Sequence, residues 1–255
     1  MVNYKVEISK DKIEFYKKNG WVVLEKIFNK NEVSFYKKKI FDYLKKNHKK
    51  FSGRDINYSS NSKTFEKISS FHNLQSNKFI KKISEKGVIF EMAKKLLNKT
   101  PELRASELFI KKKNLGKPTP IHQDDYYWNV KNNEGLTIWI ALTPSNKSNG
   151  SVFYFSKSHK KGIQEHTPSF IKGSSQKIKK ESILSNFKKI TPKINQGDVV
   201  IHNSLVFHGS HKSRSNLKRI GWTFAFKPKS SYYDIERTKK YEKKLYDQIN
   251  LREAI

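Results

Sequence analysis

The chain has 255 residues, 35% of them hydrophobic and 13% aromatic, which is enough to bury a large core, and it contains no cysteine. This composition excludes disulfides, thiolate zinc sites and cysteine-ligated iron–sulfur clusters, so any metal ion needs His, Asp or Glu ligands. The net charge of +30 is compatible with nucleic acid, anionic lipid or an acidic substrate. Because the basic residues are mostly lysines spread along the chain, we expect a solvated surface and no specific nucleic-acid partner.

The sequence also bears on the compartment. No apolar run approaches the roughly 18–20 residues needed to cross a bilayer, and the first ten residues lack the apolar centre of a secretory signal. We therefore expect a cytoplasmic protein without a membrane span. Nothing in the sequence indicates an oligomeric state.

The first hundred residues are predicted to be rich in helix. Ser9 or Asp11 is a suitable cap for a short helix that Gly20 ends, and Glu32 lies where a second helix begins. We expect helices over 9–20, from 31 onward and over 79–98, a strand within 21–28, and a loop over 52–78.

Short strands separated by turns are predicted after Pro101. The expected strands are Arg104–Lys111, Ile121–Val130, Leu136–Leu142, Ser151–Phe155, Lys189–Ile194, Asp198–His202, Leu205–His208 and Arg219–Lys227. This pattern favours a sandwich, barrel or jelly roll. The polar stretch 162–188 is a candidate mobile loop or lid, and the last residues are typical of an amphipathic helix. We expect one domain over 1–255, with a helix-rich part (1–100), a β core (101–227) and a helical tail (228–255).

The stretch PTPIHQDDYYWNV at 118–130 contains a possible metal-binding pair. On a strand, His122 and Asp124 would project to the same face and Gln123 to the other. A polar surface turn is the alternative for this pair. His208 is the favoured third ligand of a facial triad, the arrangement of non-haem Fe(II) oxygenases, because GS follows it and Arg219 lies on the next strand. His202 is the alternative third ligand.

Several segments, taken in order, resemble the phytanoyl-CoA dioxygenase-like family of Fe(II)/2-oxoglutarate oxygenases. They are NGWVVLEKIF near the N-terminus, HQD at 122–124, LTIWIALTPSNKSNGSVFYFSKSHKKG at 136–162, GDVVIHNSLVFHGS, and Arg219. The resemblance covers roughly residues 9–227 and implies a mainly β fold, a double-stranded β-helix (jelly roll, cupin-like) with N-terminal helices packed on it.

The resemblance also implies a ligand set. His122, Asp124 and His208 would bind iron, and Arg219 would pair with the distal carboxylate of 2-oxoglutarate, for which its planar fork is suited. Ser210 would add a hydroxyl contact to that carboxylate, and Thr137 and Trp139 are candidates for the wall of the co-substrate pocket. The family often has Asn five residues beyond the distal His, where this chain has Ser213. Trp139 and Arg219 also have plainer interpretations, as a core residue and as a surface cation.

The implied activity is that of an Fe(II)/2-oxoglutarate-dependent dioxygenase, which uses O₂ to hydroxylate a small-molecule metabolite. A polar or anionic metabolite is favoured. Related halogenases replace the carboxylate at the position of Asp124 with a small residue, so its presence favours oxygen insertion. Tyr126, Tyr127 and Trp128 are candidates for substrate contact or for the core. The alternative functions are a basic jelly-roll module that binds nucleic acid or an anionic surface, and a cupin-like metalloenzyme that does not use 2-oxoglutarate.

Overall fold

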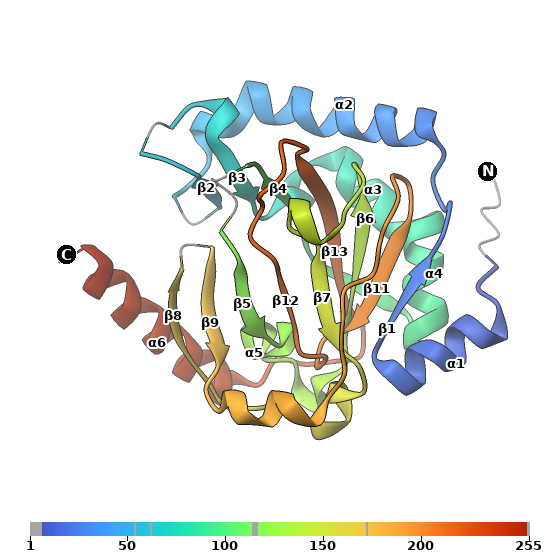
Figure 1. Cartoon of the computed structure of the whole chain (residues 1–255), viewed down its shortest axis with the longest axis vertical. Helices are drawn as coiled ribbons and strands as arrows, with labels where there is room; N and C mark the ends of the chain where they lie inside the picture. Colours follow the sequence, from blue (N-terminus) through green and yellow to red (C-terminus); the bar gives the residue numbers. More distant parts are fainter. Residues whose placement is uncertain (1–6, 54, 62, 114–116, 172, 254–255) are drawn as a thin grey trace.

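Two antiparallel sheets lie face to face in the computed structural model, which describes residues 7–253 except 54, 62, 114–116 and 172 (Figure 1). The seven-stranded sheet has the order β1 (Trp21–Leu24), β11 (Val199–Asn203), β6 (Leu136–Ala141), β13 (Arg219–Pro228), β4 (Pro101–Lys111), β3 (Ile68–Phe71) and β2 (Ile56–Tyr58). The four-stranded sheet has the order β10 (Lys189–Ile190), β7 (Val152–Phe155), β12 (His208–Ser210) and β5 (Thr119–His122). This arrangement confirms the predicted jelly roll.

Helices pack on the seven-stranded sheet, along the top and behind it in Figure 1, and one of them lies at the lower right beside β1. They are α1 (Lys10–Asn19), α2 (Lys30–Asn47), α3 (Lys78–Glu85) and α4 (Val88–Leu97). Ser9 caps α1, and Asn29 and Glu32 form a reciprocal capping box at the start of α2. The helices bury their apolar faces against alternate residues of β13, namely Trp222, Phe224 and Phe226.

The same alternation turns the other residues of β13 and β4 toward the four-stranded sheet. Arg219 pairs with Lys111 at one end of the two strands, and Thr223 pairs with Glu107 nearer the middle. Because successive side chains on a strand point to opposite faces, these four residues share the inner face of the sheet. The fold therefore encloses a polar interior between its two sheets.

Several segment predictions were wrong in part. Residues 52–78 are not only loop, because β2 and β3 lie there and extend the larger sheet. The helix expected over 79–98 is two helices, since Gly87, with φ 92°, breaks it. Strand Lys189–Ile194 ends at Ile190, and strand Leu205–His208 lies instead at His208–Ser210.

The polar stretch 162–188 is more ordered than a loop. It contains the hairpin of β8 (His166–Ile171) and β9 (Ser174–Ile178), followed by a 3₁₀ helix at Glu181–Asn186. The hairpin lies beside β5 and is contacted by α6 (Ile235–Glu253), the predicted C-terminal helix (Figure 1). A lid function for this hairpin stays a prediction. Within the described ranges, no helix combines the length and apolar character that a membrane span requires.

Candidate metal centre

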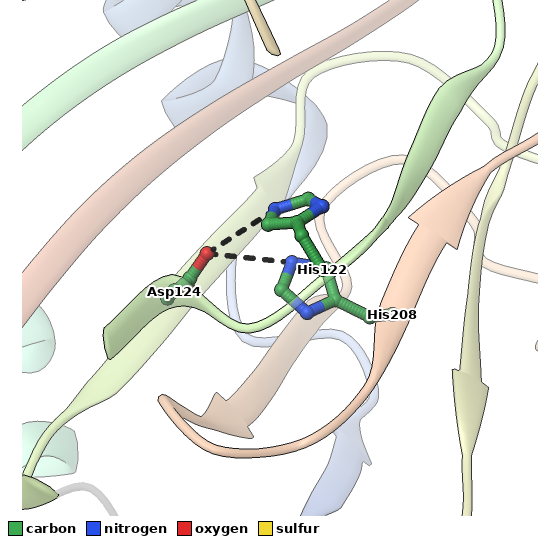
Figure 2. Close-up of side chains that lie close together, drawn as sticks. All are labelled: His122, Asp124 and His208. Atoms are coloured by element: carbon green, nitrogen blue, oxygen red, sulfur yellow. Dashed lines mark ion pairs between the residues drawn. The ribbon is translucent and has the colours of Figure 1, made fainter. Parts of the chain in front are cut away.

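Two neighbouring strands of the smaller sheet bring His122 and His208 together. His122 is the last residue of β5 and His208 the first of β12, and the two residues are direct partners in the antiparallel register. Their rings lie 4.3 Å apart, centroid to centroid. Asp124 is the first residue of the short helix α5 (Asp124–Trp128), and its side chain points back toward both rings (Figure 2).

The geometry leaves one nitrogen of each ring free for a ligand. Nδ1 of His122 donates to the Pro120 carbonyl at 2.8 Å, and Nδ1 of His208 donates to the Val206 carbonyl at 3.0 Å. These hydrogen bonds select the tautomer in which Nε2 carries a lone pair. Both Nε2 atoms face Oδ1 of Asp124, at 3.6 and 3.4 Å.

The second oxygen of Asp124 is held by the larger sheet. Thr137 donates to Oδ2 at 2.6 Å, and Nε2 of His202 donates to the same oxygen at 3.0 Å. Burial raises the pKa of Asp124, but the surrounding histidines, His208 first and then His122 and His202, hold it well below its usual range. Asp124 is therefore a carboxylate with Oδ1 directed at the two imidazoles.

This donor set fits a divalent metal ion. One ligating atom from each of His122, Asp124 and His208 lies within 4.8 Å of the others. Burial, and then the neighbouring His208, lower the pKa of His122, which favours the neutral imidazole that binds metals. Two imidazoles and one carboxylate on one side of a site form the facial arrangement that suits Fe(II) and leaves other positions open.

The spacing in the sequence brought His122 and Asp124 together correctly, but the local structure of the two residues differs from the predicted strand. The expected strand over 121–130 ends at His122, and Asp124 begins α5. The chain turns here because two contacts hold Asp125 in place. Its N–H donates to the Ser204 carbonyl, and its carboxylate pairs with Arg237 of α6 at 3.1 Å. Gln123 points away from the centre, as predicted, and its amide donates to the Leu205 carbonyl at 2.7 Å.

A second polar group lies at the Arg219 end of the inner face. Arg219 and Lys111 are 3% and 7% exposed, and no carboxylate of the described residues forms an ion pair with either. Burial, and then Arg219, lower the pKa of Lys111 to about 6, while burial lowers the pKa of Arg219 to about 10. A buried guanidinium beside a buried amine, with no counter-ion among the described residues, is costly, which makes this pair a candidate binding site for an anion. Sequence reasoning missed Lys111, although its place opposite Arg219 in the register could have been inferred once β4 and β13 were paired.

Ser210 joins this anion site. Lys111 donates from Nζ to Ser210 Oγ at 2.6 Å and to the His211 carbonyl at 2.7 Å, and Ser210 donates to Thr119 Oγ1 at 2.6 Å. Ser210 thus lies beside both the metal ligand His208 on its own strand and the buried lysine. Its predicted contact with the co-substrate carboxylate stays a prediction.

Trp139 lies between the metal centre and the anion site. It pairs in register with the inner-face residue Thr223, and its ring lies 5.6 Å from the Arg219 guanidinium carbon. Gly221 allows this approach, because a Cβ there would meet the Trp139 ring at 2.2 Å. Thr137, predicted beside it on the co-substrate wall, uses its hydroxyl on Asp124 instead.

The three aromatic residues after Asp124 lie on α5 rather than on a strand, and they face different neighbours. Tyr127 packs edge-on to His122 at 5.4 Å, so it lies next to the metal centre. Tyr126 stacks on His166 at 4.0 Å, and Trp128 is buried against Ala105. Of the three, only Tyr127 contacts a metal-ligand candidate.

Comparisons with known proteins agree with this geometry. The family model described as Phytanoyl-CoA dioxygenase (PhyH) matches residues 16–221. No curated protein matches the sequence.

The solved structures with a similar fold have low sequence identity. EctD from S. alaskensis, solved with bound Fe, is 19% identical with a TM-score of 0.73, over 92% of this chain and 81% of that chain. The non-heme alpha ketoglutarate dependent carbocyclase SnoK from nogalamycin biosynthesis is 18% identical with a TM-score of 0.70, over 89% and 87%. EvdO2 from Micromonospora carbonacea var. aurantiaca, solved with 2-oxoglutarate, is 14% identical with a TM-score of 0.69, over 90% and 94%.

Proposed function

Because this chain belongs to the phytanoyl-CoA dioxygenase (PhyH) family, we propose that it is an Fe(II)/2-oxoglutarate-dependent oxygenase that hydroxylates a small-molecule metabolite. His122, Asp124 and His208 hold the iron. The bound metal, chelated by 2-oxoglutarate, supplies O₂ activation and oxidation of a substrate C–H bond, with succinate and CO₂ as the other products.

The observation that carries the proposal is the pairing of two unlike sites in one interior. A neutral bis-imidazole and carboxylate triad suits iron, and the buried guanidinium of Arg219 beside the amine of Lys111, which takes up a proton when an anion binds, suits a distal carboxylate. A dicarboxylate co-substrate spans both sites, whereas a metalloenzyme without one has no use for the second. The same contrast favours the oxygenase over a basic binding module.

The residues around the two sites have distinct roles in this reaction. Arg219 offers a planar fork of donors to the carboxylate, and Lys111 and Ser210 supply additional donors to it. Thr137 and His202 hold the far oxygen of Asp124, so the near oxygen stays directed at the metal. The buried ring of Trp139 keeps water from the space between the sites.

Hydroxylation is the reaction that Asp124 favours. Asp124 would itself hold the metal, whereas a small residue at this position would leave room for a halide, so the carboxylate favours oxygen insertion. Solved structures of similar fold include a carbocyclase and an epimerase, so the test must identify the product as well as the co-substrate.

The test is turnover of 2-oxoglutarate with a panel of metabolites under Fe(II) and ascorbate. We expect one succinate per product, and a product that gains one oxygen atom from isotopically labelled O₂. His208→Ala is expected to abolish both. Succinate release with a cyclised or epimerised product would retain the oxygenase class and refute hydroxylation, and iron binding without any succinate would refute the whole proposal.

A further inference from the structure

Arg104 lies on the inner strand β4, at an irregularity in its pairing with β13. Ala225 pairs with Ala105 and the next residue, Phe226, pairs with Leu103, so Arg104 is the extra residue of a bulge. A bulge re-aims the side chain of its unpaired residue, and bulges are common beside active sites. Arg104 extends over the ring of Trp128, whose centre lies 5.4 Å from the guanidinium carbon.

The guanidinium of Arg104 has no anionic partner among the residues that the structure describes. Across the described part of the chain, it makes no ion pair, and its Nε is buried without a hydrogen bond. Stacking on Trp128 fixes the plane of the group through cation–π attraction and leaves its N–H edge free. A fixed, partly buried guanidinium with free donors is suited to two oxygens of an anion.

A row of aromatic rings connects Arg104 to the metal centre. Tyr127 packs on His122 at 5.4 Å, and Tyr241 of α6 packs on Tyr127 at 5.8 Å. Tyr127 also packs against the buried cluster that contains Trp128, so Arg104, which lies over the Trp128 ring, is at the other end of this row. A molecule lying along these rings would therefore reach from Arg104 toward the metal.

Neither acidic residue of β4 neutralises Arg104, because Glu102 pairs with Lys227 at 3.0 Å and Glu107 is engaged by His72. Glu107 also lies on the inner face of β4, but its carboxylate accepts a hydrogen bond from Nδ1 of His72 at 2.5 Å. His72 is fixed in turn by Asn57 and Ser70, which lie 3.2 and 3.1 Å from its Nε2. This network leaves the charge of Arg104 available to a ligand.

We propose that Arg104 binds a carboxylate or phosphate group of the substrate and, with Tyr127 and Tyr241, orients the substrate toward the metal. This inference rests on the proposed function, because it assigns the substrate class of the same site. The substrate is then a small anionic molecule with an apolar or aromatic body. Its anionic group lies at Arg104, and the carbon that reacts lies nearer His122.

The test uses simple probes, since it does not require the natural substrate. The full chain is loaded with Mn(II), which does not turn over, and with excess 2-oxoglutarate, which fills the site at Arg219. Benzoate and phenyl phosphate are the anionic probes, and benzamide is the neutral match of benzoate. Paramagnetic broadening of probe proton signals reports binding near the metal.

The variants are Arg104→Gln, Arg104→Lys and the control Arg214→Gln, which removes an exposed arginine elsewhere. We expect an anionic probe to bind the wild type and the control equally, and to bind Arg104→Gln about 10- to 100-fold more weakly, as loss of a charge-assisted contact predicts. The affinity of Arg104→Lys for the anionic probe should lie between those of the wild type and Arg104→Gln. Thermal unfolding and Mn(II) and 2-oxoglutarate affinity should be unchanged in all three variants.

Three results would overturn the inference: no broadening of either anionic probe, equal binding of benzamide and benzoate, or equal loss in the control. Failure of the proposed function has a different signature, because the wild type would then bind no Mn(II) and 2-oxoglutarate before any probe is added. Preference between benzoate and phenyl phosphate identifies which anionic group the substrate carries.

Discussion

Replacement of Lys111 by methionine is expected to change stability and co-substrate binding in opposite directions. Lys111 is 7% exposed, and burial together with Arg219 lowers its pKa from 10.5 to about 6. In the unfolded chain this lysine is protonated at pH 7, so the folded protein must release that proton. Methionine has a similar shape and removes the cost.

The magnitude follows from the displaced pKa. A lysine that releases its proton at pH 7 from an unfolded pKa of 10.5 costs about 5 kcal/mol at 1.36 kcal/mol per pH unit. Loss of the hydrogen bonds to Ser210 and His211 offsets about 1 kcal/mol each. We therefore expect Lys111→Met to raise the free energy of unfolding of the ligand-free protein by about 1–3 kcal/mol.

The pH dependence of the free energy of unfolding tests the direction of this effect independently. Because the pKa of Lys111 is depressed on folding, the unfolded chain binds one proton more between about pH 6 and 10.5, and wild-type stability falls as pH is lowered through that window. The methionine variant lacks this contribution, so its advantage grows from pH 10 to pH 6.

The assay is denaturant unfolding of wild type, Lys111→Met and the exposed control Lys113→Met, with and without 2-oxoglutarate and Mn(II). The variant should bind 2-oxoglutarate about 10- to 100-fold more weakly, since it loses one charge-assisted contact, while Mn(II) alone binds normally. A less stable Lys111→Met protein, or one with unchanged 2-oxoglutarate affinity, would refute this account of the anion site.

Three further predictions concern the same interior. Binding of 2-oxoglutarate should be coupled to the uptake of about one proton near pH 7, because the bound carboxylate raises the pKa of Lys111 above about 6. Calorimetry in buffers of different ionisation enthalpy measures this proton uptake, and its absence would contradict the prediction. His202→Ala should weaken metal binding about 10- to 100-fold by freeing one oxygen of Asp124, as metal titration would show; unchanged affinity would remove His202 from the site. Gly221→Ala should cost about 1–3 kcal/mol of stability by displacing the ring of Trp139, and a neutral result in denaturant unfolding would mean that the ring moves freely.

Much of the fold could be predicted because it depends on local signals. The cap Ser9, the first-turn Glu32 of α2 and the alternation in β13 are visible in the sequence, and each predicts an element that the structure contains. The hairpin of β8 and β9 was missed because its polar residues carry no strong alternation. It is ordered by contacts with β5 and α6, which are distant in the chain.

The residues of the candidate metal centre could be predicted from the sequence, but their local backbone structure could not. Spacing and resemblance identify His122, Asp124 and His208, yet the turn into α5 depends on the pairing of Asp125 with Arg237, 112 residues away. Lys111 was missed for a related reason. A lysine in a lysine-rich chain has no distinctive signal until the strand register places it opposite Arg219.

Anomalous diffraction at the iron absorption edge is the most direct test of the central claim. Crystals would be grown without O₂ in the presence of Fe(II) and 2-oxoglutarate. We predict one iron peak bounded by Nε2 of His122, Oδ1 of Asp124 and Nε2 of His208, with the distal carboxylate of 2-oxoglutarate at Arg219 and Lys111. Iron at any other residues, or 2-oxoglutarate bound away from Arg219, would contradict the account.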